Sequence, residues 1–144
     1  MADPSSDPGL AMCFKVTVDN AHPLGEFISC EGLGCEITIE QREVGGNNDF
    51  VYQLPVRIKF TNVKLTRPLN ADSRNVAAWF ASMSGNVSRS TVQIVALKAD
   101  GSEVTQWNLK DVIPVRWQGP SFSAESNKVA TETLELAHHG FLKA

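Results

Sequence analysis

The chain has 144 residues and a formal net charge of -3, with 42% apolar and 20% charged residues. This composition is typical of a globular domain and disfavours a disordered chain. The chain contains no apolar run near the roughly 18 residues that a membrane-spanning helix needs. Its negative net charge argues against general binding to nucleic-acid phosphate. Residues 10–144 are predicted to form a single domain that follows a flexible N-terminal arm, 1–9, rich in Pro, Ser and Asp.

The N-terminus and the cysteines bear on where the protein resides. The arm lacks the positive start and apolar centre of a secretory signal, so we expect the chain to stay where it is made. Cys13, Cys30 and Cys35 include no C-x-x-C pair, which favours free thiols. A metal site of Cys30 and Cys35 with His138 and His139 matches none of the usual zinc spacings, and we expect neither a metal nor a cofactor.

The N-terminal half predicts strands. Alternation of apolar and polar residues gives a first strand at 14–18, a turn at 20–25, and a second strand that begins at Phe27. In a third strand, Ile37 and Ile39 point to one face, and Glu36, Thr38 and Glu40 point to the other.

A charged, glycine-rich loop follows the third strand. It is longer than a tight hairpin turn, which indicates a loop that makes contacts, and it consists of Glu43, Val44, Gly45, Gly46, Asn47, Asn48 and Asp49. The chain returns through a strand at 50–60, where Pro55 predicts a break or an edge.

The middle of the chain predicts one short helix. Asp72 or Ser73 is a good N-cap, and Val76, Trp79, Phe80 and Met83 follow at helical spacing up to Gly85. This apolar stripe is expected to pack on a sheet.

The C-terminal half predicts strands again. Asp100 and Gly101 mark a tight hairpin between strands at 91–98 and 103–109, and further strands are expected at 112–117 and 129–137. The whole predicts a mainly β fold, a mostly antiparallel sandwich or barrel with one short α-helix.

Known catalytic patterns are absent from the sequence, so we expect no enzyme. Gly45 and Gly46 lack the Lys and Ser or Thr of a phosphate-binding loop. His138 and His139 could supply a base, although histidines near a C-terminus are more often surface or interface residues. Three tryptophans, at positions 79, 107 and 117, could instead form a sugar-binding platform.

Polar alternation gives a further signal. Thr131, Thr133 and Glu135 alternate with Leu134 and Leu136, as on the strand at 36–40. Both an assembling protein and a monomeric sandwich produce this pattern, and the pattern alone leaves the choice open.

Beyond these patterns, the chain after Gly9 resembles the tail-tube proteins of contractile phages and related injection particles, of the T4-like or Hcp-like type. The residues that carry the resemblance are Phe27, Cys30, Gly32, Leu33, Glu40 to Asn47, Lys64, Thr66, Arg67, Trp79, Trp107, Pro114, Val115, Glu125, Asn127, Val129, Ala130, Glu132, Leu134, Leu136, His138 and Gly140. His139 stands where many relatives carry an acidic residue.

The resemblance implies hexameric rings that stack into a tube inside a contractile sheath, with baseplate and tube-initiator proteins as further partners. Six subunits with four strands each would close a barrel of about 24 strands, roughly 50 Å across, with a bore of about 40 Å. Such a bore would pass a protein effector or DNA as cargo. The resemblance also implies assembly in the bacterial cytoplasm and a final location in the tail or injection particle without membrane anchoring.

We therefore expect Glu36, Thr38, Glu40, Thr133 and Glu135 to face the lumen. The loop from Glu43 to Asp49 is expected to contact the next ring. The main alternative is a monomeric β-sandwich that binds carbohydrate, and a weaker one is a small hydrolase.

Overall fold

The structure is a computed structural model that describes residues 13–43, 51–119 and 130–142. It is mainly antiparallel β with one helix, which confirms the predicted fold class. The elements are β1 (Cys13–Val18), β2 (His22–Phe27), β3 (Ser29–Glu31), β4 (Cys35–Glu43), β5 (Val51–Phe60), β6 (Val63–Pro68), α1 (Ser73–Ser82), β7 (Ser90–Leu97), β8 (Glu103–Gln118), β9 (Thr131–Ala137) and β10 (Phe141–Leu142).

The larger sheet returns on itself. Its strand order is β2-β1-β7-β8-β9-β6-β3, and β10 pairs with β8. The two end strands, β2 and β3, are separated in sequence only by Ile28, whose N–H donates to the Thr66 carbonyl at 2.9 Å. One bent strand therefore pairs with β1 over its first part and with β6 over its second. We call this sheet, together with α1, the body.

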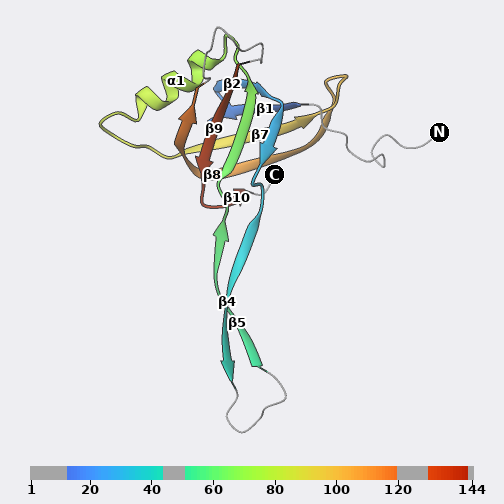
Figure 1. The fold of residues 1–144 in the computed structure, drawn as a ribbon, viewed down its shortest axis with the longest axis vertical. Coiled ribbons are helices and arrows are strands. Elements are labelled where there is room, and N and C mark those ends of the chain that lie inside the picture. The colour runs from blue at the N-terminus through green and yellow to red at the C-terminus, as the bar shows by residue number, and fades with distance from the viewer. Residues whose placement is uncertain (1–12, 44–50, 120–129, 143–144) are drawn as a thin grey trace, which may run out of the picture.

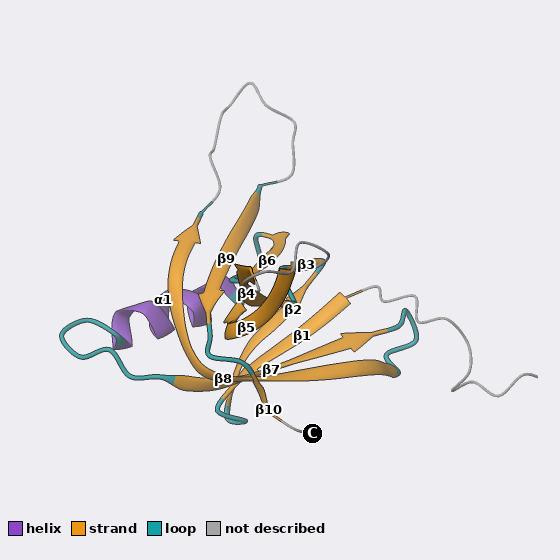
Figure 2. Cartoon of the chain, turned by 90° about the horizontal axis from the view of Figure 1, so that it is seen from below, coloured by secondary structure: helices purple, strands orange, loops and turns teal. Residues whose placement is uncertain are grey.

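Strand β8 belongs to both parts of the body, one formed with β2, β1 and β7 and the other formed with β9, β6 and β3. The sequence predicted separate strands at 103–109 and 112–117, but the structure has one strand from Glu103 to Gln118. Its pairing with β7 ends at Val112, and its pairing with β9 begins at Ile113. The bend lies at Asp111, which has a φ of 52°, and Figure 2 shows β8 curving upward beside β9. The predicted turn at 20–25 is also shorter, since β2 already begins at His22.

The core lies between the two parts of the body and under α1. It includes Phe27, Leu65, Ile94 and Leu109, all fully buried. Val76 and Trp79 of α1 are buried in the same cluster, with Phe80 and Met83 packed against it, which confirms the predicted stripe. Asp72 holds the N-cap position, as predicted, but its side chain makes no capping hydrogen bond to the helix.

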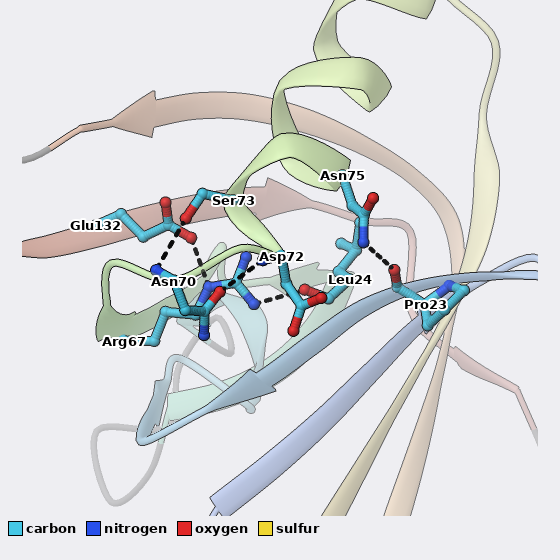
Figure 3. A network of polar contacts seen from close by, with 8 residues as sticks. All are labelled: Pro23, Leu24, Arg67, Asn70, Asp72, Ser73, Asn75 and Glu132. Atoms are coloured by element: carbon cyan, nitrogen blue, oxygen red, sulfur yellow. Dashed lines mark hydrogen bonds and ion pairs between the residues drawn. The ribbon is translucent and has the colours of Figure 1, made fainter.

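A buried ion pair crosses this core (Figure 3). Arg67 Nε of β6 donates to Glu132 Oε1 of β9 at 2.5 Å, and Arg67 Nη1 donates to the Leu24 carbonyl of β2 at 2.5 Å. The guanidinium also lies 4.2 Å from the Phe27 ring centroid. Because one side chain reaches β9, β2 and Phe27, it holds together strands from both parts of the body.

The ribbon, defined as β4 and β5, forms a separate two-stranded sheet. Figure 1 shows it projecting far from the body. The pairing shifts register between Thr38 and Ile39, opposite Pro55 and Val56, where the sequence predicted a break. Side chains at 35–41 and 53–59 are exposed on both faces of the ribbon.

Candidate functional site

One face of the ribbon presents apolar side chains to solvent. Ile37 lies opposite Ile58, and Ile39 continues the same face beyond them. These three isoleucines, which we call the isoleucine face, are 50%, 57% and 50% exposed for Ile37, Ile58 and Ile39 respectively. Contiguous exposed apolar residues of this kind mark interaction surfaces.

The opposite face of the ribbon is polar and balanced in charge. Glu36 lies directly opposite Lys59, Thr38 lies opposite Arg57, and Glu40 lies opposite Leu54, the one apolar residue among these six. Alternation along a single strand predicted Glu36, Thr38 and Glu40 for this face, but it could not place Arg57 and Lys59 opposite them. Cross-strand partners can be predicted only when the register of the hairpin is known, and this register shifts at the bulge beside Pro55.

The other two predicted lumen residues lie on the body. Thr133 and Glu135 are on the outer face of β9, while Leu134 and Leu136 are fully buried, as the alternation predicted. By register, Glu135 lies between Lys64 and Arg116, and Lys64 lies between Glu135 and Glu31, so two acids and two bases alternate across this row. The predicted lumen residues thus divide between two sheets.

The body contains a four-stranded section in the order β8-β9-β6-β3, which we call the inner section. In β8 this section starts at Ile113, past the last residue paired with β7. Among the described residues, the outer edge of β8 from 113 to 118 and the outer edge of β3 have no strand partner. The β8 edge also carries Val115 and Trp117, which are 48% and 39% exposed. Unpaired edges of this kind are suited to pairing with another chain.

The predicted inter-ring loop can be placed only at its start. Glu43 is the last residue of β4. Positions 44–50 lie outside the described residues.

The tryptophans, Cys30 and His138, which were considered for binding or catalysis, lie in surroundings that do not favour either role. Trp79 is buried under α1, Trp107 packs partly against the core, and Trp117 lies on the β8 edge, so the three do not form one platform. Burial, together with the carboxylate of Glu31, raises the pKa of Cys30 to about 11, which is opposite to what a reactive thiolate requires. His138 is buried, with both ring nitrogens in hydrogen-bonding contacts.

A cavity of about 480 Å³ lies between α1 and the β1–β2 turn, lined in part by Trp79, Met83 and Leu24. Asp19 at its rim already accepts a hydrogen bond from the Thr91 N–H at 2.9 Å. The cavity is therefore a gap between packed elements and not a cluster of reactive groups.

Comparison with known proteins points to one family. The profile of the T4-like virus tail tube protein gp19 family matches residues 10–142. No curated protein sequence matches the chain. None of the helices among the described residues is long and apolar enough to cross a membrane.

Several solved structures share the fold. A chain in the baseplate of the anti-feeding prophage is 24% identical with a TM-score of 0.77, over 95% of each chain. A chain in the sheath-tube complex of PVC, an extracellular contractile injection system in its extended state, is 21% identical with a TM-score of 0.79, over 99% of this chain and 97% of that one. Hcp1 from Salmonella typhimurium is 19% identical with a TM-score of 0.54, over 90% of this chain and 83% of its own.

Proposed function

The chain belongs to the T4-like tail tube protein family, so it is a structural tube protein and not an enzyme; from this premise we propose that it forms hexameric rings that stack into the inner tube of a contractile injection particle or phage tail. The observation that carries the proposal is the inner section, which among the described residues has no strand partner at either of its two edges, β8 from 113 to 118 and β3. The carbohydrate-binding alternative finds no support, because the tryptophans lie in three different environments.

The open edges suggest how a ring closes. The β8 edge of one copy and the β3 edge of the next are different surfaces, so their pairing is head to tail and forms a closed ring when the rotation between copies fits. Four strands from each of six copies give a barrel of about 24 strands with a bore of about 40 Å. Closure removes the edges that would otherwise pair without control.

In this ring the lumen is lined by Thr133 and Glu135 of the inner section and by the polar face of the ribbon, with Glu36, Thr38 and Glu40. Bases stand opposite or beside Glu36 and Glu135 in register, whereas Glu40 lies opposite Leu54. With Glu31 and Arg57 included, the acids and bases of this mainly polar wall balance. Such a wall lacks the clustered positive charge that would hold nucleic acid. It is suited to conducting a protein effector or DNA without retaining it.

The ribbon supplies contacts beyond a single copy. Its isoleucine face is exposed in the isolated chain, and a neighbouring copy would remove it from water. The loop from Glu43 to Asp49 at the far end of the ribbon is proposed to contact the next ring.

The likeness to chains of a sheath-tube complex and a baseplate suggests further partners. We propose that a sheath protein surrounds the tube and that baseplate and initiator proteins start it. We further propose that the tube assembles in the bacterial cytoplasm and becomes part of the particle, and that sheath contraction drives the tube through the target envelope.

The test is electron microscopy of the purified full chain in negative stain, with and without baseplate components. Rings and tubes with a bore near 40 Å are expected. Deleting Gly45 to Asn48 should leave a folded protein that forms no long tubes. A species of 15.7 kDa at every concentration, even with the baseplate added, would contradict the proposal.

A further inference from the structure

The ribbon joins the body at its root, where residues 32–34 connect β3 to β4 and residues 61–62 connect β5 to β6. Gly32 has a φ of +89°, and a Cβ at this position would lie 2.1 Å from the Asn62 carbonyl oxygen. Thr61 Oγ1 donates to the Gly32 carbonyl at 2.6 Å. The two connections are therefore in direct contact, at a spacing that only glycine permits.

His138 holds this root from the side of the body. Its Nε2 lies 3.1 Å from the Thr61 carbonyl oxygen, and its Nδ1 lies 3.1 Å from the Gly140 nitrogen, whose N–H donates to it. A carbonyl oxygen only accepts, so Nε2 carries a hydrogen. Nδ1 also lies 3.4 Å from the Gly140 carbonyl oxygen, but the Gly140 N–H is closer and makes Nδ1 the acceptor. His138 is 6% exposed, and each of its ring nitrogens lies within hydrogen-bond distance of a partner.

Aromatic packing adds to these hydrogen bonds. The His138 ring centroid lies 5.6 Å from that of Phe60, the last residue of β5, and 5.3 Å from that of Phe141 in β10. Phe60 also meets Phe141 edge to face at 5.8 Å. Gly140 has a φ of +125°, and a Cβ there would lie 3.0 Å from Phe60 Cζ, so this glycine allows the close approach.

The C-terminal turn that carries His138 is itself fixed to β8. The Lys110 N–H donates to the Gly140 carbonyl at 2.9 Å, and the His139 N–H donates to the Lys110 carbonyl at 3.0 Å. A connected set of contacts therefore runs from β8 through Gly140 and His138 to Thr61, and from Thr61 to Gly32.

We propose that His138 is a positioning residue that fixes the direction in which the ribbon leaves the body. Both faces of the ribbon are exposed beyond the root, so contacts at the root set its direction. The consequence for assembly rests on the proposed function, because a ribbon that swings would present its isoleucine face to a neighbour only part of the time. The direction itself does not depend on any assembly.

The direct test is the distance between two spin labels, one on the ribbon at Gln41→Cys and one on the body at Glu103→Cys. Both native residues are exposed. The native cysteines are replaced by Ser or Ala, and the labelled full-length chain is diluted with unlabelled chain so that only distances within one molecule are read. With His138 present, double electron–electron resonance spectroscopy should give one narrow distribution of the distance between the two labels. His138→Ala should broaden it while the circular dichroism of the body is kept.

Three further variants separate positioning from general stability. His138→Gln keeps a donor that can reach the Thr61 carbonyl and should restore the narrow distribution, whereas His138→Asn is too short to reach it and should not. His139→Ala is the matched control, since His139 is exposed and contacts Asp111 at 3.6 Å. A folded His138→Ala chain with an unbroadened distribution would overturn the proposal, even if its melting temperature fell.

A second measurement decides the matter if the variants do not fold. Nitrogen-15 NMR of the wild-type chain should find His138 as the Nε2–H tautomer, and the Nδ1–H tautomer would overturn the proposal. Normal tubes from a His138→Ala chain whose distance distribution is broadened would count against the assembly role of the ribbon direction and not against the role of His138.

Discussion

The body and the ribbon contain the same alternating pattern in opposite environments. Leu134 and Leu136 of β9 are fully buried, whereas Ile37 and Ile39 of β4 are each 50% exposed. Both pairs alternate with acids and threonines along a strand. Alternation therefore shows that two faces of a strand differ, but it does not show what covers the apolar face. In the body the cover is the same chain, and for the ribbon we propose a neighbouring copy.

This difference has consequences for stability. An isolated two-stranded hairpin is marginal in water, whereas a sheet of more strands with a packed face is independently stable. The body should therefore determine the measured free energy of unfolding, and the ribbon should determine assembly. Four predictions test this division.

The largest effect is expected at the buried ion pair of the body. Arg67→Met leaves the Glu132 carboxylate buried without its partner and also removes the contact with Phe27, so we expect a loss of about 3–5 kcal/mol in the free energy of unfolding. Urea unfolding followed by circular dichroism measures it.

Two variants control this experiment. Lys64→Met replaces an exposed base on the same strand, and its free energy of unfolding should stay within about 0.5 kcal/mol of the wild type. Adding Glu132→Leu to Arg67→Met should recover much of the loss, since no buried charge remains. An Arg67→Met chain as stable as the Lys64→Met chain would show that the pair does not hold the two parts of the body together.

The second prediction compares matched apolar truncations in the two regions. Leu136→Ala opens a cavity in the core and should lower the free energy of unfolding by about 2–5 kcal/mol. Ile39→Ala removes a half-exposed side chain and should cost less than about 1 kcal/mol in the unassembled chain. Equal losses in urea unfolding would mean that the ribbon is covered by its own chain in solution.

The sequence predicted the parts of the fold that local patterns control. The stripe of Val76 and Trp79 identified the helix, Asp100 and Gly101 identified the hairpin, and Pro55 identified the irregular point in β5. Each of these signals lies within a few residues of the structure that it determines. The family resemblance, and not the patterns, identified the chain as a tube protein.

Features that depend on distant parts of the chain could not be predicted in this way. The continuity of β8 through Asp111 requires β9 and β7 to pair on either side of the bend. The bases opposite Glu36 and Thr38 require the register of the hairpin. His138 was considered as a base or an interface residue, and its buried contact with Thr61 joins residues that are far apart in sequence.

The third prediction concerns the isoleucine face. Ile37→Ser with Ile58→Ser should hardly change the unfolding of the body, but it removes apolar area that a neighbour would cover. Completing the burial of two half-exposed isoleucines contributes about 1.5–3 kcal/mol, so the concentration needed for assembly should rise about 10- to 100-fold. Sedimentation measures it, and Val87→Ser, at another exposed apolar residue outside the ribbon, is the control. Unchanged assembly of the double variant would remove the isoleucine face from the interface.

The smallest effect is expected on the polar face of the ribbon, where Glu36 lies opposite Lys59. Glu36→Lys places like charges opposite each other, and we expect a loss of about 0.2–1 kcal/mol in ribbon stability, measured by hydrogen exchange of the ribbon amides. Combining it with Lys59→Glu restores opposite charges and should restore the exchange rates.

The exchanged pair, Glu36→Lys with Lys59→Glu, also keeps the net charge of the wall, whereas the single variant does not. If this face lines the lumen, cargo passage should follow the net charge, so that it changes in Glu36→Lys and recovers in the exchanged pair. Recovery of the exchange rates without recovery of cargo passage would separate the two roles and place the lumen requirement on Glu36 itself.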